Sequence, residues 1–185
     1  VKSEKKISIF SDYDVDGACA AAICKKFLSQ FDIEVNVYIP NRLNEGYGLN
    51  LEAIEKILTF SQNILVLDCG SNNLKEQEYI INQGGQVMII DHHECELFFD
   101  QAIVVNPKTP NDQSELDDLC ATALTFLVLV YLKNENIFPN IDVLQYLDLV
   151  ALATICDLVP LSEINRSFVK QGLKVINSDS VNKGI

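Results

Sequence analysis

Acidic side chains recur at alternate positions in the stretch SDYDVDG, which carries Asp12, Asp14 and Asp16. Like charges this close repel one another, so a compensating positive charge is expected, and a divalent cation is the obvious source. The pattern D-x-D-x-D-G also opens an EF-hand calcium loop. That loop needs a glutamate at its twelfth position, where this chain has Ile23. An EF-hand is therefore excluded.

Two more apolar segments end in residues that can bind metal or move protons. Asp68 follows NILVL, and the run Asp91-His92-His93 follows QVMII. This run contains the only two histidines of the chain. Neighbouring side chains at a strand end point in different directions, so one imidazole can bind a metal while the other faces a substrate.

A further carboxylate lies in an apolar part of the C-terminal half. Asp157 sits in TICDLVPL, and a carboxylate buried there is costly unless it is paired or bound to metal. The alternative is an aspartate that simply ends a helix before Pro160. The local sequence favours neither interpretation over the other.

These donors indicate a particular chemistry. An oxygen-rich set with one or two imidazoles suits Mn²⁺ or Mg²⁺ better than zinc. Four carboxylates would balance the charge of two such ions, namely Asp14, Asp16, Asp68 and Asp157. Two ions can activate water and hold a phosphoryl group for in-line attack, so we expect a metal-dependent phosphoesterase. A phosphatase of the haloacid dehalogenase type is an alternative, because its nucleophilic aspartate starts a D-x-D-G run after a strand. It is a minor alternative, because such an enzyme has little use for a histidine pair.

The elements that must position these residues follow from the apolar pattern. Strands are predicted at 6–11, 33–39, 63–67, 86–90 and 103–105, with helices at 17–28, 51–58 and 74–82 between the first four. Later helices are predicted at 116–133, 143–154 and 165–176. The expected fold is α/β, with a mostly parallel five-stranded sheet flanked by helices and a helical C-terminal part. Parallel strands bring their carboxyl ends to one edge, so three acidic strand ends should converge there.

Composition limits the possible functions. The 185 residues allow one domain with a substantial core, and the apolar stretches 119–132 and 143–155 are too short to cross a bilayer. We see no signal peptide, and the six cysteines have no CxxC spacing, so a cytoplasmic protein with reduced thiols and no membrane partner is expected. The net charge of −12 argues against a broad nucleic-acid surface, except in an enzyme that meets phosphate through bound metal.

The chain resembles the DHH phosphoesterase superfamily, named for the tripeptide at 91–93, and within it the RecJ family of 5′→3′ exonucleases specific for single-stranded DNA. The runs that carry this resemblance keep the expected order and span nearly the whole chain: SDYDVDGA, PNRLNEGYGL (40–49), LDCG (67–70), IIDHHE (89–94), VVNP (104–107) and TICDLVPLSEINRSFVKQGL (154–173). The EGYGL loop and the final NR…V..GL run point to the RecJ branch. Nanoribonucleases, cyclic-dinucleotide phosphodiesterases and family II pyrophosphatases resemble the chain less closely.

The resemblance implies a role for each position. It implies two Mn²⁺ or Mg²⁺ ions held by Asp14, Asp16, Asp68, His92 and Asp157, with Asp12 as a less certain ligand. Asp68 would bridge the two ions, and His93 would face the scissile phosphate. Arg42 and Arg166 would bind phosphate or form salt bridges within the fold.

The resemblance also sets expectations for the domain and its partner. The chain is expected to be the DHH catalytic domain over residues 1–185, without the DHHA1 and nucleic-acid-binding domains of the family. The implied function is phosphodiester hydrolysis of single-stranded DNA in repair and recombination. Two alternatives are a phosphodiesterase of short oligonucleotides or cyclic dinucleotides, and a domain that binds metal without catalysis. One departure is CATALTF (120–126), where RecJ proteins usually carry a glycine-rich CGAGVAF-like run; losing those glycines could alter a close backbone approach.

Overall fold

The computed structural model describes residues 5–96, 99–110, 112–138 and 140–185. Its central sheet has the strand order β2-β1-β3-β4-β5, and every neighbouring pair is parallel. The strands are β1 (Lys6–Ser11), β2 (Glu34–Tyr38), β3 (Asn63–Leu67), β4 (Gln86–Ile90) and β5 (Ile103–Val105). The predicted five-stranded α/β fold is confirmed, with a sheet that is parallel throughout the described residues.

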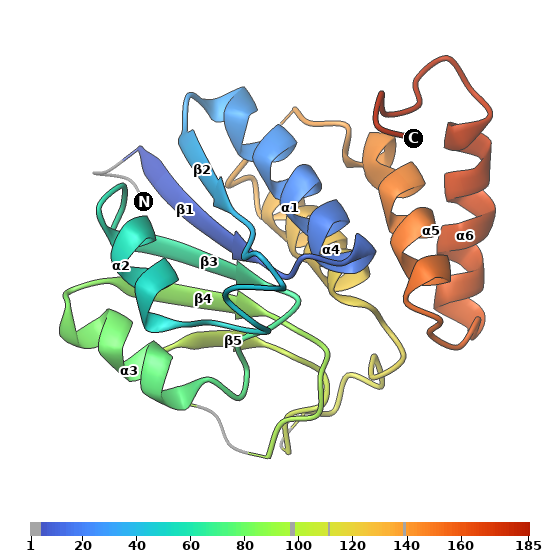
Figure 1. Ribbon diagram of the computed structural model, residues 1–185. Helices are drawn as coiled ribbons and strands as arrows, with labels where there is room; N and C mark the ends of the chain where they lie inside the picture. The colour runs from blue at the N-terminus through green and yellow to red at the C-terminus, as the bar shows by residue number, and fades with distance from the viewer. Residues whose placement is uncertain (1–4, 97–98, 111, 139) are drawn as a thin grey trace.

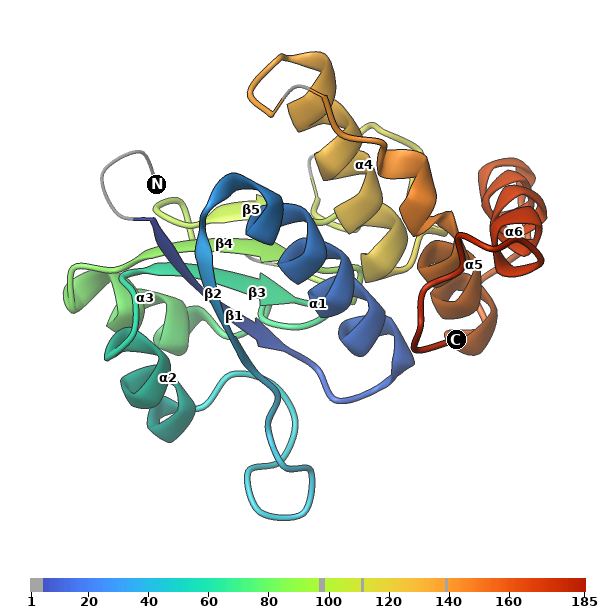
Figure 2. The same ribbon diagram turned by 90° about the horizontal axis from the view of Figure 1, so that it is seen from above.

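Helices cover both faces of this sheet (Figures 1 and 2). On one face lie α2 (Leu51–Leu58) and α3 (Leu74–Asn82), and on the other lie α1 (Val15–Leu28) and α4 (Ala121–Asn134). Helix α5 (Leu147–Cys156) packs on α1 and α4, and α6 (Glu163–Ile176) packs on α5. No helix among the described residues is long and apolar enough to cross a membrane.

The sheet separates two apolar cores. Ile9 and Phe10 are adjacent in β1 and fully buried, but Ile9 belongs to the core under α1 and α4, whereas Phe10 belongs to the core under α2 and α3. Successive side chains of a strand point to opposite faces, so a strand covered on both sides is apolar at consecutive positions. This explains why β3, β4 and β5 are apolar at consecutive positions in the sequence.

Helices α5 and α6 approach closely at a glycine. A β-carbon on Gly172 would lie 2.2 Å from the carbonyl oxygen of Leu147 and 2.4 Å from the β-carbon of Ala151. Both distances are shorter than any van der Waals contact, so only glycine permits this spacing. The close contact seats α6 firmly against α5.

The segment after α6 returns to α5 and satisfies a buried charge. Asp148 is fully buried, and its two carboxylate oxygens accept hydrogen bonds from the Asn182 side-chain amide at 2.6 and 2.7 Å and from the Asn182 backbone N–H at 2.7 Å. Lys26 at the end of α1 donates to the Asn182 side-chain oxygen. Asn182 therefore links a cation of α1 to a carboxylate of α5.

Some helix boundaries differ from those predicted. Helix α1 begins at Val15, not Gly17, because the Asp14 carboxylate accepts from the backbone N–H of Gly17 at 3.0 Å and caps the first turn. Helix α4 begins at Ala121, not Leu116, and α6 begins at Glu163, not Asn165. The predicted helix 143–154 is a 3₁₀ turn over Val143–Tyr146 followed by α5.

Candidate metal centre

The three acidic strand ends meet at one edge because the sheet continues one residue beyond each strand. The backbone N–H of each strand-end aspartate donates to the last carbonyl of the neighbouring strand. These bonds join Asp12 to Leu67 at 3.2 Å, Asp68 to Ile90 at 2.9 Å, and Asp91 to Val105 at 3.0 Å. In a sheet of this strand order, ligands bind where the connections diverge, between β1 and β3. Asp12 directly follows β1 and Asp68 directly follows β3, so the two residues flank that point. Figure 1 shows the carboxyl ends of the strands together at this edge.

Ligand atoms gather there in three overlapping groups, each with its atoms within 4.8 Å of one another. The groups are Asp12, Asp14 and Asp68; Asp68, His92 and His93; and Asp16, His92 and Asp157. Asp68 and His92 each belong to two groups, and Asp68 lies between the β1 carboxylates and the histidines. The arrangement therefore offers candidate metal-binding groups that are joined through Asp68 and His92.

Asp68 has the environment of a group that needs a cation. Its side chain is 2% exposed, and neither carboxylate oxygen accepts a hydrogen bond from any residue that the structure describes. Burial raises the pKa of Asp68 far above its usual value, and the charges of Asp16 and Asp14 raise it further. Its backbone is held in the left-handed region at φ 60°, which is strained for a residue other than glycine. A divalent cation would relieve this electrostatic cost, so the residues present fit a metal.

His92 reaches into the same space. Its Nε2 lies 3.3 Å from Asp68 Oδ1, 3.6 Å from Asp157 Oδ2 and 3.8 Å from Asp16 Oδ2. Burial lowers the pKa of His92 despite the carboxylates nearby. The lowered pKa favours the neutral imidazole, which is the form that binds a metal.

Asp91 belongs to none of these groups, and its carboxylate instead binds the two histidines. Its Oδ1 accepts from the backbone N–H groups of His92 at 2.8 Å and His93 at 3.2 Å and lies 2.7 Å from His93 Nδ1, while its Oδ2 accepts from Ser71 N–H at 3.0 Å. Burial alone would raise the pKa of Asp91, but these hydrogen bonds lower it to about 2. The bond from Asp91 in turn raises the pKa of His93.

Asp16 is tied to a segment more than a hundred residues away in the sequence. Its Oδ2 accepts from Ala121 N–H at 2.6 Å and its Oδ1 from Thr122 N–H at 2.9 Å, while the Thr122 hydroxyl donates to the Asp16 carbonyl at 2.8 Å. The carboxylate therefore caps the N-terminus of α4, where the helix dipole favours negative charge. The backbone of the CATALTF segment therefore approaches Asp16 closely, through the N–H groups of its alanine and threonine.

Asp157 is the last residue of the cluster and lies at the C-terminal cap of α5. Burial, followed by the charges of Asp16 and Asp14, raises its pKa to about 6. Leu158 reverses the chain at φ 58°, and the side-chain amide of buried Asn165 holds the turn by donating to the Pro160 carbonyl at 2.8 Å. Asp157 thus ends a helix, as one interpretation expected, and its Oδ2 also lies 3.6 Å from His92 Nε2 in the acidic cluster.

The remaining predicted residues are Asp12, Arg42 and Arg166, and only the first two lie near the cluster. Asp12 is buried, burial raises its pKa, and its Oδ1 has no hydrogen-bond partner within the described ranges. Arg42 lies over the ring of Tyr13 at 5.4 Å, beside Asp12. Arg166 is exposed in the first turn of α6, and no ion pair or hydrogen bond among the described residues joins its guanidinium to the cluster. The structure thus stacks Arg42 on Tyr13, near enough for its charge to act on Asp12, and shows no such proximity for Arg166 among the described residues.

Two supporting residues were not identified from the sequence. The amide of buried Asn106 donates to the Ser71 hydroxyl at 2.9 Å and to the His93 carbonyl at 3.0 Å. Tyr47 places its hydroxyl beside the His93 ring. Asn106 lies in the motif VVNP and Tyr47 in the motif EGYGL, but neither motif indicates what its polar side chain contacts.

Fold and site together define an α/β domain with a carboxylate and imidazole cluster of metal-binding type at the carboxyl edge of a parallel sheet. The model of the DHH family, N-terminal domain, matches residues 6–154, so the chain belongs to the DHH family. Membership of this family excludes the haloacid dehalogenase interpretation.

Similar proteins include the single-stranded-DNA-specific exonuclease RecJ of Thermus thermophilus, which is 34% identical over 180 residues, 97% of this chain and 26% of that protein. A crystal structure of exonuclease RecJ bound to manganese superposes with a TM-score of 0.83 at 34% identity, covering 94% of this chain and 44% of that one. A structure of T. thermophilus RecJ with Mg²⁺ has a TM-score of 0.62 at 28% identity, covering 94% and 21%. The chain spans only about a quarter of the length of the RecJ proteins of T. thermophilus and Bacillus subtilis.

Proposed function

We propose that this chain is the catalytic DHH domain of a RecJ-like exonuclease, which hydrolyses single-stranded DNA from its 5′ end in DNA repair and recombination. The observation that carries the proposal is the position of Asp68, a buried carboxylate without hydrogen-bond partners among the described residues, between two groups of metal-binding atoms. The similarity to RecJ proteins supports the substrate class. We further propose that residues 1–185 form this one domain and that it works in the cytoplasm, since all six cysteines are free thiols.

Two Mn²⁺ or Mg²⁺ ions, when bound, would supply Lewis acidity toward phosphate oxygens and lower the pKa of water. The residues that would hold them are Asp14, Asp16, Asp68, His92 and Asp157, with Asp12 beside them. In hydrolysis, a water oxygen forms the new bond to phosphorus, the bond to the leaving oxygen breaks, and that oxygen takes up a proton. His93 would contact the scissile phosphate, because its Nδ1 is bound to Asp91 and its side chain is 45% exposed.

Substrate binding would use a cation close to the site. Arg42 lies beside Asp12 and could contact a phosphate of the DNA. We assign Arg166 a weaker role, on the phosphate backbone away from the cluster.

The experiment that tests the proposal uses Mn²⁺ and single-stranded DNA labelled at either end, with short oligonucleotides and a cyclic dinucleotide in parallel. Asp68→Ala serves as the inactive control, and Asp179→Ala, at an exposed carboxylate, as the matched variant that should behave like the unchanged protein. Release of mononucleotides from the 5′ end is expected. Products from short or cyclic substrates alone would indicate the phosphodiesterase alternative. Mn²⁺ binding without any hydrolysis would indicate a domain that binds metal without catalysis.

A further inference from the structure

The loop between β2 and α2 is built to hold one aromatic side chain. The Glu45 carboxylate accepts from Asn41 N–H at 2.7 Å and from the Tyr38 hydroxyl, and Glu45 N–H donates to the Asn41 carbonyl at 2.8 Å. Gly46 and Gly48 then take left-handed conformations, with φ of 77° and 80°, which residues with a β-carbon rarely adopt. The EGYG sequence therefore forms an anchored turn with Tyr47 between its two glycines.

This turn places the Tyr47 side chain against His93. The Tyr47 hydroxyl lies 3.3 Å from Nε2 and 3.4 Å from Nδ1, and the two rings are tilted at 72° with centroids 5.9 Å apart. Both distances are at the long end of the hydrogen-bond range, and their near equality means that the hydroxyl is not aligned with one nitrogen. The contact is therefore weak and leaves the hydroxyl free to donate elsewhere.

Nothing else that the structure describes fixes this hydroxyl. Tyr47 is 56% exposed, and its only hydrogen-bond partners among the described residues are the two nitrogens of His93. A phenol kept only for stability usually buries its ring and gives its hydroxyl a firm partner. Tyr47 does neither, although its turn is anchored through Glu45.

The surroundings keep the hydroxyl protonated. Burial of its polar end raises the pKa of Tyr47 well above its usual value, and the nearby Cys69, Asp91, Asp12 and Asp68 raise it further. A neutral phenol is a hydrogen-bond donor. It therefore offers a donor to an anion bound beside His93, where the other side chains are mainly carboxylates.

We propose that Tyr47 is a catalytic residue of this site, and that its hydroxyl donates a hydrogen bond to a non-bridging oxygen of the scissile phosphate next to His93. The inference rests on the proposed phosphodiester hydrolysis and adds to it a contact to the reacting group. Negative charge develops on those oxygens during phosphoryl transfer, so a fixed donor there stabilises the transition state more than the bound substrate. Two side chains would then meet the phosphate opposite the carboxylates: the His93 imidazole and the Tyr47 phenol.

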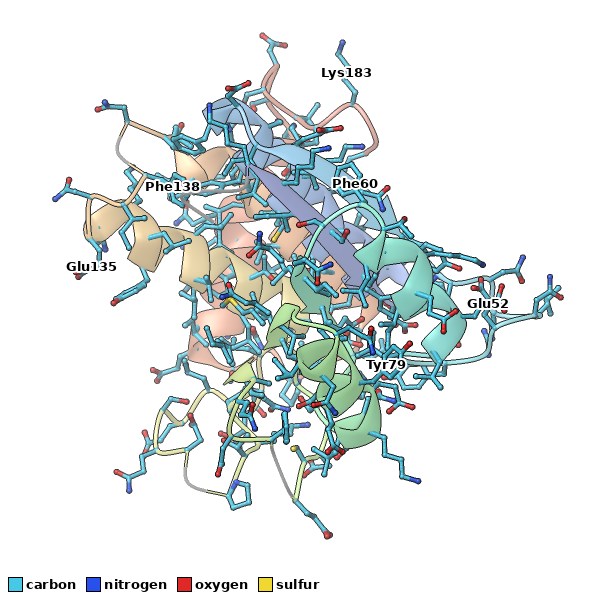
Figure 3. All side chains as sticks on the ribbon, turned by 90° about the vertical axis from the view of Figure 1, so that its left-hand side faces the viewer. Glu52, Phe60, Tyr79, Glu135, Phe138 and Lys183 are labelled. Carbon is cyan, nitrogen blue, oxygen red and sulfur yellow. The ribbon has the colours of Figure 1, made fainter. Side chains whose placement is uncertain are left out.

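The test compares Tyr47→Phe, which removes only the hydroxyl, with the unchanged chain on a 5′-phosphorylated single-stranded oligonucleotide and Mn²⁺. We expect kcat to fall roughly 10- to 100-fold, the range for losing one donor to a charged oxygen, with KM nearly unchanged. Mn²⁺ affinity, measured by calorimetry, should not change. Tyr79→Phe is the matched control, because the Tyr79 hydroxyl contacts Glu55 between α3 and α2 (Figure 3) and its loss should leave kcat as it was.

A second measurement separates a direct contact from a structural role. Each non-bridging oxygen of the scissile linkage is replaced by sulfur, one stereoisomer at a time, because sulfur accepts hydrogen bonds poorly. For the isomer that removes the acceptor of Tyr47, the penalty of Tyr47→Phe should nearly vanish, whereas it should persist for the other isomer.

The outcomes are distinct. An unchanged kcat in Tyr47→Phe overturns the inference alone. So does a loss of kcat that is equal for both isomers or that accompanies weaker Mn²⁺ binding, since either would mark a structural role. No hydrolysis by the unchanged chain would overturn the proposed function, and this inference with it.

Discussion

Replacing Asp91 by asparagine should lower the free energy of unfolding of the protein, although Asp91 belongs to none of the three groups of metal-binding atoms. Its carboxylate accepts from three backbone N–H groups and contacts the His93 imidazole. An asparagine keeps one acceptor oxygen and turns the other into an NH₂ group. Whichever way it is oriented, a buried N–H of Ser71 or of the histidines then loses its acceptor.

The magnitude follows from the acidity of this group. The pKa of Asp91 is about 2 in the folded protein, against an ordinary value of 3.8. At about 1.4 kcal/mol for each pH unit, the surroundings stabilise the charged form by about 2–3 kcal/mol. Because the folded pKa is depressed, this stabilisation is fully present above pH ~4 and is lost as the pH falls through about 2. Asp91→Asn should therefore lower the free energy of unfolding at pH 7 by about 2–3 kcal/mol.

The assay is urea unfolding at pH 7 with a chelator, so that metal does not contribute. Asp32→Asn is the control, since the ion pair that Asp32 forms with Lys5 is exposed and its loss should have little effect. The variant should also lower the pKa of His93, which NMR can follow because the chain has only two histidines. Mn²⁺ affinity should fall roughly 10- to 100-fold, as is usual when the partner that orients metal-binding residues is lost. Unchanged stability together with an unchanged His93 titration would refute the reasoning.

Three further predictions concern packing, the C-terminal segment and pH. Gly172→Ala should cost about 2–3 kcal/mol, or roughly 5–10 °C in Tm, whereas Gly184→Ala, whose β-carbon meets no described atom within 4 Å, should be neutral by calorimetry. Asn182→Ala should lower the free energy of urea unfolding by about 1–3 kcal/mol, because the buried Asp148 carboxylate loses the side-chain amide donor while keeping its backbone donors. Lys183→Ala, at an exposed side chain nearby (Figure 3), should have no such effect. Without metal, proton uptake by Asp157 should add about 1 kcal/mol of stability as the pH falls from 7 to 5, because its pKa is raised to about 6 in the folded protein; the raised pKa of Asp68 acts in the same direction. Saturating Mn²⁺ should abolish that rise, and a flat or opposite trend in metal-free protein would contradict the assignment of this carboxylate.

The sequence was enough to predict the sheet and where its chemistry lies. Strand segments that alternate with helices indicate βαβ units and a mostly parallel sheet, and parallel strands end at a common edge. Asp12, Asp68 and Asp91 each follow such a segment directly. Their convergence therefore depended only on strand direction, which the alternation of strands and helices already fixed.

Helix starts were less predictable, because they depend on partners that the local sequence does not reveal. The start of α4 at Ala121 is set by the carboxylate of Asp16, which is 105 residues away in the sequence and accepts from the first N–H groups of the helix. The start of α1 at Val15 was closer to a local signal, since Asp14 caps its own helix, but the apolar pattern alone placed it at Gly17.

The sequence by itself therefore determined the fold class, the edge that carries the site and the donor types gathered there, because strand direction and residue chemistry are local properties. The tertiary structure alone decided what each donor contacts. Asp91 contacts the two histidines, and Asp16 also caps α4. Asp68 has no hydrogen-bond partner among the described residues, and Tyr47 contacts His93, which lies 46 positions further along the chain. The physical reason is that hydrogen-bond satisfaction in a buried site depends on which distant segments pack beside it, and packing is a property of the whole chain.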